Sequence, residues 1–240
     1  MSTSRTGRST FFALLALLRL ANLPTVWTNV LASAVLGAAP FRAAAWGLVA
    51  FSMTCFYLGG LVLNDYCDRD WDRRHRPERP IPSGAIGPGT AGALAAGLLL
   101  AGLGLLAAAP SWRGLPGGVL LLGMIAVYDR WHKGNPAAPL LMAGCRVLAC
   151  LVPALALGGG IGVAVLLLAG LQLGWVALLS IVARRSQQRP ALRPAVPWLL
   201  AGISLVDGAM LAALASPWWI LPGLGAALLT RAAQRWAPGD

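Results

Sequence analysis

The residues best suited to chemistry lie in one short stretch, residues 64–84, which reads NDYCDRDWDRRHRPERPIPSG. It holds five of the eight Asp and Glu residues of the whole chain, and it directly follows an apolar run, residues 48–63, that carries no formal charge. Carboxylates are costly at the edge of a membrane, so a cluster of them in that place indicates a functional site. The rest of the sequence either crosses a bilayer or frames this cluster.

The spacing of the acidic residues predicts a cation site. If the apolar run continues as a helix, Asn64, Asp68 and Asp72 lie on one stripe, because residues four apart share a helix face. Asp65 then lies beside Asn64, and Asp70 points away. Several oxygen ligands on one face suit Mg²⁺, which commonly takes one or two carboxylates together with substrate phosphates.

A group of cations follows the acids and would complement a diphosphate. Its members are Arg73, Arg74, Arg76 and Arg79. A metal ion together with Arg or Lys is a recurrent way to hold a diphosphate and to stabilise it as a leaving group.

Other interpretations of the stretch compete with this one. An EF-hand does not fit, because the sixth position counted from Asp68 is Arg73 rather than Gly, and the twelfth is Arg79 rather than Glu. A solvated loop that only sets membrane topology explains the Arg residues but not four Asp at the membrane edge. A structural ion-pair network without a substrate is the third alternative.

The composition predicts an integral membrane protein. Hydrophobic residues make up 58% of the chain and charged residues 11%, with a mean hydropathy of +0.69. The 240 residues leave room for about eight spans of roughly 20 residues. A net charge of +11 would suggest nucleic acid in a soluble protein. Here the basic residues lie between apolar runs, so we expect them to set topology, and we expect no nucleic-acid partner.

The apolar runs predict an all-α, polytopic helical bundle that forms one membrane domain over residues 1–240. The expected spans are residues 20–39, 45–64, 91–109, 115–128, 138–157, 163–183, 195–215 and 218–229. The last is short and broken by Pro222, which suggests a re-entrant or tilted helix. Residues 1–18 resemble a signal peptide, but Arg19 interrupts their apolar core and no cleavage site follows. We therefore expect an interfacial helix or a flexible N-terminus there.

The basic residues also predict the orientation. Sixteen of the 19 Lys and Arg lie at the termini or in the loops on their side, against two in the opposite loops. This bias places both termini and the acidic stretch in the cytoplasm, and in a bacterium the protein would be a multi-pass protein of the plasma membrane. Arg146 falls inside the span at 138–157, so we expect it to face the bundle interior.

The Cys and His residues do not suggest a metal centre. The four Cys form no CxxC pattern and are interpreted as small buried residues. His75 and His132 stand alone in expected loops, and we expect neither to bind a metal.

The acidic stretch resembles a known motif. Asn64-Asp65-x-x-Asp68-x-x-x-Asp72, followed by RPERPIPSG at 76–84, is similar to the first Asp-rich motif of the UbiA superfamily of intramembrane prenyltransferases. Residues 19–29 (RLANLPTVWTN) and the pattern Tyr128-Asp129-x-x-x-Lys133 are similar to that family as well. The resemblance implies a bundle, classically of nine spans, around a central cavity capped by cytoplasmic loops.

The resemblance also implies an activity. Such enzymes bind an isoprenyl diphosphate through Mg²⁺, ionise it to an allylic cation and transfer the prenyl group to an aromatic or other lipophilic acceptor. Carried over, Asn64, Asp65, Asp68 and Asp72 hold the metal, and Asp68, Asp72 and Lys133 are catalytic. The implied substrate-binding residues are Asn22, Asn64, Arg73, Arg79, Tyr128, Arg146, Arg184 and Arg185. Tyr128 either lines the cavity, where its ring would stabilise a cation, or belongs to the interfacial belt.

One loop departs from the family. The superfamily carries a second Asp-rich motif between its sixth and seventh spans, but residues 182–190 read VARRSQQRP and hold no acid. Either Arg184, Arg185 and Arg189 neutralise the diphosphate directly, with Gln187 offering a neutral oxygen, or ionisation is lost and the protein is a non-catalytic carrier or binder of an isoprenoid-like precursor. A further hypothesis pairs Asp207 with Arg146 inside the membrane.

A second resemblance concerns a branch of the superfamily. The segments YDRWHK at 128–133 and MAGCR at 142–146 are similar to the EboC branch, whose members also lack the usual second motif. We expect prenyl transfer, with the carrier as the alternative.

Overall fold

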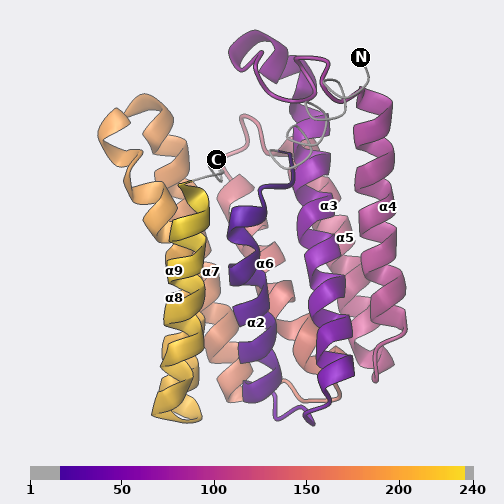
Figure 1. Cartoon of the computed structure of the whole chain (residues 1–240), viewed down its shortest axis with the longest axis vertical. Coiled ribbons are helices and arrows are strands. Elements are labelled where there is room, and N and C mark those ends of the chain that lie inside the picture. The colour runs from indigo at the N-terminus through magenta and orange to yellow at the C-terminus, as the bar shows by residue number, and fades with distance from the viewer. Residues whose placement is uncertain (1–16, 236–240) are drawn as a thin grey trace, which may run out of the picture.

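The computed structural model describes residues 17–235, and this part of the chain is helical with no strand. Eight α-helices run side by side in a bundle (Figure 1). Their bounds are α2 Leu23–Leu36, α3 Ala43–His75, α4 Pro88–Ala107, α5 Leu115–Trp131, α6 Ala138–Ala156, α7 Val163–Gln188, α8 Ala195–Leu214 and α9 Ile220–Gln234. Short 3₁₀ turns precede four of them: η1 Leu20–Asn22, η2 Trp112–Gly114, η3 Pro190–Leu192 and η4 Pro217–Trp219.

The eight helices match the eight expected spans, and the all-α prediction is confirmed. Five of them (α3, α4, α6, α7 and α8) are long and apolar enough to cross a membrane. The other three are shorter, with 14 residues in α2, 17 in α5 and 15 in α9. Pro222 does not break the last helix as we expected. It lies in the first turn of α9, where backbone N–H groups have no partner within the helix and proline is tolerated.

Helix α3 determines where the acidic stretch lies. Its 33 residues make it roughly 50 Å long, which exceeds a hydrocarbon core of about 30 Å. Its last turns therefore extend beyond the apolar layer, and in Figure 1 they stand above the neighbouring helices. We call this the acidic end of the bundle: the last turns of α3, the loop to α4, the α5–α6 connection and the α7–α8 connection.

The loop after α3 folds back onto the bundle. Gly84 has φ +78°, a left-handed conformation that favours glycine, at the point where the chain turns toward α4. On either side of this turn Ile81 and Ile86 are buried, and they pack in one cluster with Val62 of α3 and Ala91 of α4. The two isoleucines hold the loop against the end of α3. They thereby fix the position of Arg79, which comes just before them in the loop.

A second buried polar group lies among the helices, away from the acidic end. Asp207 of α8 is fully buried, and its Oδ2 accepts a hydrogen bond from Thr28 Oγ1 at 2.9 Å. Its Oδ1 accepts from Gln172 Nε2 at 2.6 Å and from Asn29 Nδ2 at 3.4 Å. These partners tie α2 and α7 to α8.

The expected pair between Asp207 and Arg146 is not formed. No salt bridge joins them within residues 17–235, and the Arg146 guanidinium instead donates to the Thr25 carbonyl oxygen at 2.9 Å. The neutral donors of α2 and α7 satisfy the carboxylate, so an ion pair is not required there.

Asp207→Ala is expected to destabilise the bundle by about 2–4 kcal/mol, because the Gln172 and Asn29 amides and the Thr28 hydroxyl lose their acceptor in an apolar interior. Unfolding in mixed micelles with rising SDS would measure the loss. The control is Leu205→Ala, which truncates a side chain on the same helix that is 39% exposed. Equal small losses in both variants would show that the network does not hold the helices together.

Candidate functional site

The acidic face of α3 points into the protein. Because the helix continues to His75, Asn64, Asp68 and Asp72 share one face, with Asp65 beside them. Asp65, Asp68 and Asp72 are buried, whereas the Asp70 side chain is 68% exposed. Three carboxylates in one buried place require compensating charges or hydrogen bonds.

Two arginines supply part of that charge. The Arg19 guanidinium lies 2.8 Å from Asp65 Oδ1. The Arg79 guanidinium bridges two acids, at 3.2 Å from Asp65 Oδ1 and 3.0 Å from Asp72 Oδ2. Arg79 comes from the loop that the buried isoleucines hold, and Arg19 comes from the turn before α2. The site therefore joins three segments of the chain.

The end of α5 and the α5–α6 connection supply the other partners of the acidic face. Lys133 Nζ lies 2.8 Å from Asp68 Oδ1, and His132 Nε2 lies 3.4 Å from Asp68 Oδ2. Asn64 Nδ2 donates to Asp129 Oδ1 at 3.1 Å. The Tyr128-Asp129-x-x-x-Lys133 segment thus faces the acidic helix.

His132 lies at this site, contrary to our expectation that it stands alone. Its Nδ1 lies 3.2 Å from the Tyr128 carbonyl oxygen and therefore carries the hydrogen, while Nε2 faces Asp68. The hydrogen bond to Asp68 and the charge of that carboxylate raise the pKa of His132 above its ordinary value, although burial opposes the shift. Tyr128 stacks on the imidazole, with ring centroids 5.0 Å apart.

The donor set fits a hard divalent cation that also binds a diphosphate. Asp72 Oδ1 and Asp129 Oδ2 are buried oxygens without a hydrogen-bond partner. In the part of the chain that the structure describes, no three His, Cys, Asp or Glu side chains are grouped closely enough to hold a metal by themselves. A metal bound here would therefore take further ligands from a phosphate, which is how Mg²⁺ is commonly held.

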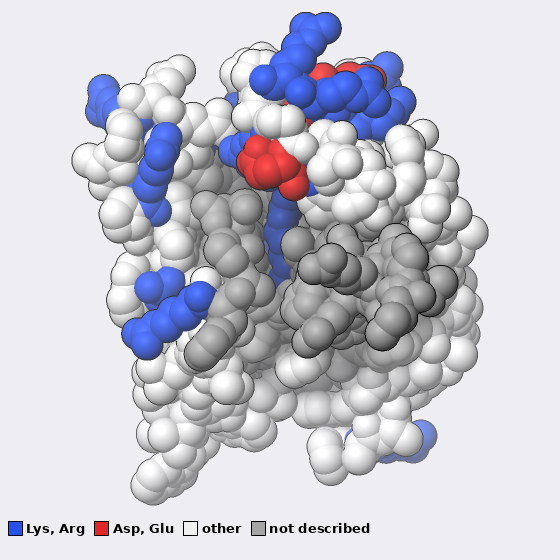
Figure 2. All heavy atoms as spheres, turned by 45° about the horizontal axis from the view of Figure 1, so that its top comes forward, with Lys and Arg blue, Asp and Glu red and all other residues white. Residues whose placement is uncertain are grey.

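Not every implied residue lies at this cluster. Residues 184–188, which we expected in a loop, are the last turns of α7, and from there Arg184 Nη2 donates to the His132 carbonyl oxygen at 3.1 Å. The acid-free segment therefore does reach the site. Arg73 lies on the exposed face of α3 and pairs with Asp70 at 3.1 Å. Arg185 is exposed and has no ion pair among residues 17–235. The Lys and Arg side chains dominate the surface at this end, with few acids visible among them (Figure 2).

Two implied residues make other contacts at the start of α2. Asn22 is buried, and its Oδ1 accepts a hydrogen bond from Gln234 Nε2 at 3.0 Å. Arg146 is bonded to the Thr25 carbonyl oxygen, and its Nε is buried without a partner. Both therefore lie beside the first turns of α2, and neither pairs with a described carboxylate.

Sequence reasoning omitted three members of the cluster: Arg19, Asp129 and His132. Arg19 and Asp129 lie inside the two segments whose resemblance to a family we had noted, which was the available signal. His132 gave no such signal, because its role depends on a contact with Asp68, far away in the sequence.

Comparison with known proteins gives one family match and several similar folds. The sequence profile of the UbiA prenyltransferase family matches residues 21–238. No curated protein matches the sequence. Among solved structures, a digeranylgeranylglyceryl phosphate synthase has a TM-score of 0.64 at 19% identity, covering 95% of this chain and 88% of that one.

Two archaeal structures are similar as well. A UbiA homologue from Archaeoglobus fulgidus bound to DMAPP and Mg²⁺ has a TM-score of 0.62 at 18% identity, covering 90% of this chain and 86% of that one. The apo structure of a UbiA homologue from Aeropyrum pernix K1 has a TM-score of 0.58 at 19% identity, covering 91% of this chain and 88% of that one. These likenesses show the fold. None bears on the EboC branch, which stays a prediction.

Proposed function

Because this chain belongs to the UbiA prenyltransferase family, we propose that it moves an isoprenyl group from an allylic diphosphate to an aromatic or other lipophilic acceptor within the membrane. The observation that carries the proposal is the approach of two separate segments at one place: Asp68 of α3 contacts Lys133 and His132, and Asn64 on the same helix face donates a hydrogen bond to Asp129. The charge bias of the loops supports a cytoplasmic location for this site.

The acidic face would bind the metal. Asp68 and Asp72 are the proposed ligands, with Asn64 and Asp65 in support, and the buried Asp72 Oδ1 has no hydrogen-bond partner that a cation would have to displace. When bound, Mg²⁺ neutralises charge on the diphosphate as it leaves. The proposal has a basis in a structural relative, the Archaeoglobus fulgidus homologue, which binds DMAPP and Mg²⁺.

The cations would hold the diphosphate itself. Lys133 approaches from the α5–α6 connection, Arg184 from the last turns of α7, and Arg79 from the loop after α3. The bond between the allylic carbon and the diphosphate oxygen breaks, and both electrons leave with the diphosphate. The acceptor then bonds to the allylic carbon and loses a proton. Positive groups fixed beside the leaving oxygens stabilise the charge that develops there.

Arg184 also bears on the missing acidic motif. Its side chain comes from the acid-free segment at the end of α7, and it contacts the same segment that carries Lys133. We propose that Arg184 supplies directly the positive charge that a second metal provides where a second Asp-rich motif is present.

The second candidate is a non-catalytic carrier of an isoprenoid-like precursor. One observation favours it: Asp65, Asp68 and Asp72 each already pair with a cation of the chain, as in a purely structural network. The deciding experiment measures turnover of the purified protein in detergent with radiolabelled geranyl and longer allylic diphosphates, with Mg²⁺ or with EDTA, against aromatic acceptors and water. Mg²⁺-dependent release of diphosphate supports the enzyme, and tight binding without release supports the carrier.

Within that assay, Lys133→Gln is expected to lower kcat by about 10²–10³-fold and Arg184→Gln by about tenfold, because each removes a positive charge aimed at the leaving group. The matched control is Arg130→Gln, since Arg130 is exposed and has no ion pair in the described residues. Unchanged kcat in both site variants would argue against cations in place of a second metal.

A further inference from the structure

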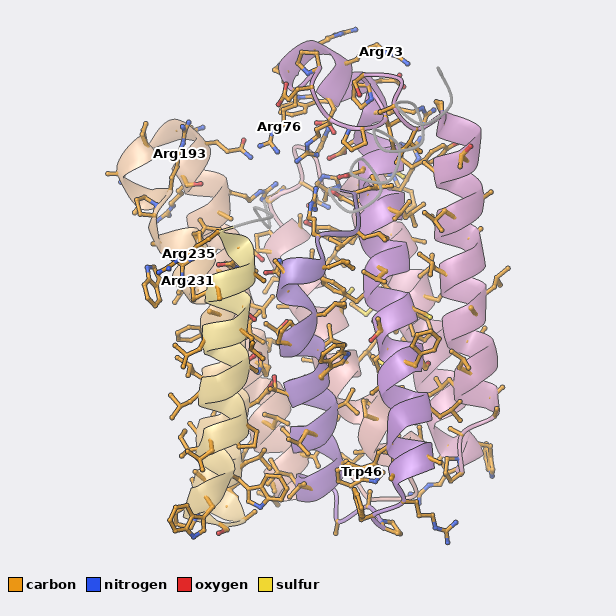
Figure 3. The ribbon with its side chains drawn as sticks, in the orientation of Figure 1. Trp46, Arg73, Arg76, Arg193, Arg231 and Arg235 are labelled. Atoms are coloured by element: carbon orange, nitrogen blue, oxygen red, sulfur yellow. The ribbon has the colours of Figure 1, made fainter. Side chains whose placement is uncertain are left out.

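Five arginines lie outside the site, at the acidic end of the bundle, and form what we call the arginine surface. They come from the end of α7, the connection to α8 and the end of α9: Arg185, Arg189, Arg193, Arg231 and Arg235. Helices α8 and α9 pack against each other. Figure 3 shows Arg193, Arg231 and Arg235 on the same side of the bundle.

Within residues 17–235, no acidic side chain compensates the positive charge of this surface. Every salt bridge within residues 17–235 involves an acid of α3, and none involves these five arginines. Arg193 Nε is held instead by the Ser186 carbonyl oxygen at 3.4 Å, and Arg231 Nη1 by Gln234 Oε1 at 2.8 Å. Neutral oxygens thus hold these two side chains, and neither side chain has an acidic partner among the described residues. Figure 2 shows blue side chains on this side without a red neighbour.

A tryptophan indicates the depth of the surface in the bilayer. Trp198 lies in the first turn of α8 and is 64% exposed. The Arg231 guanidinium lies over its ring, 4.3 Å from the centroid. Exposed Trp side chains collect at the level of the lipid headgroups, and Arg side chains extend toward that level. The arginine surface is therefore at headgroup depth rather than in bulk water.

We propose that the arginine surface binds the phosphate groups of anionic membrane lipids. Clusters of Arg beside the cytoplasmic end of a membrane helix attract such headgroups, and guanidinium groups bind phosphate in a fixed two-pronged geometry. Orientation of the chain in the membrane would require positive charge on this side, but not arginines held by neutral oxygens around an exposed Trp. Lipid bound here would hold the end of α7, and with it Arg184, beside the site.

The test uses the full chain in nanodiscs of phosphatidylcholine that contain increasing phosphatidylglycerol, with retained phosphatidylglycerol counted by native mass spectrometry. The variant is Arg193→Gln/Arg231→Gln. The control, Arg42→Gln/Arg113→Gln, removes the same charge from exposed positions at the opposite end of the bundle. We expect about 10- to 30-fold weaker phosphatidylglycerol binding in the variant and native binding in the control.

Two results would overturn the proposal. One is native phosphatidylglycerol binding by the variant. The other is release of the bound lipid by inorganic diphosphate together with a higher KM for the allylic diphosphate in the variant, which would assign the surface to the substrate. If Arg193→Gln/Arg231→Gln does not fold, Arg189→Gln/Arg235→Gln serves instead, because neither of those arginines has a side-chain hydrogen bond to another described residue.

Discussion

Asp68→Asn is expected to reduce Mg²⁺-dependent release of diphosphate by about 10³-fold, the largest effect of any single change in the chain. Asp68 is the acid that Lys133 and His132 of the α5–α6 connection both contact, with Lys133 at 2.8 Å from one oxygen and His132 at 3.4 Å from the other. An amide of the same size removes the charge and turns a donor toward one of those two side chains. The variant therefore loses a proposed metal ligand and the alignment of the groups that we propose hold the diphosphate.

The control for this prediction is two residues away. Asp70→Asn makes the same chemical change on the same helix, but the Asp70 side chain is 68% exposed and its partners are Arg69 and Arg73 on the outer face. It should keep native turnover. Release of radiolabelled diphosphate at saturating substrate measures the turnover of Asp68→Asn and of Asp70→Asn. Full activity in Asp68→Asn would remove the acidic face from the mechanism, and equal loss in both variants would point to a general electrostatic effect.

The sequence predicted the number of helices and the inward face of α3 because both depend on local regularities. Apolar runs of a span's length give the helices, and acids four residues apart give a face. The end of α3 was harder to predict. We expected the span to end at residue 64, but the helix continues to His75, since a helix that has left the apolar layer no longer carries a hydrophobic signal.

The partners of the acids could not be predicted, because they depend on how distant segments pack. Arg19 and Asp65 are 46 residues apart, and Asn64 and Asp129 are 65 apart. The Asp207 hypothesis failed for the same reason. The sequence shows that Asp207 and Arg146 fall inside apolar spans. Only packing shows that Gln172 and Thr28 reach Asp207.

Arg79→Gln is expected to destabilise the protein by about 3–5 kcal/mol, which is the largest loss of stability that the structure predicts. Arg79 is the only described cation that pairs with Asp72, and it also contacts Asp65, which keeps Arg19 as a second partner. The side chains of Arg79 and Asp72 are 16% and 2% exposed. Removal of the guanidinium therefore leaves a buried carboxylate without a counter-charge. SDS-induced unfolding in mixed micelles measures the loss.

Arg73→Gln is the matched control, because Arg73 and Asp70 are 62% and 68% exposed and such a surface pair contributes about 0–1 kcal/mol. A double-mutant cycle with Asp72→Asn isolates the pair itself, since neutralising the acid should recover most of what Arg79→Gln loses. Mg²⁺ should also stabilise Arg79→Gln more than the native protein, because the freed oxygens of Asp72 would then bind the cation without competition from a guanidinium. If the loss is small, or if neither Asp72→Asn nor Mg²⁺ recovers it, Arg79 does not balance the charge of the acidic face.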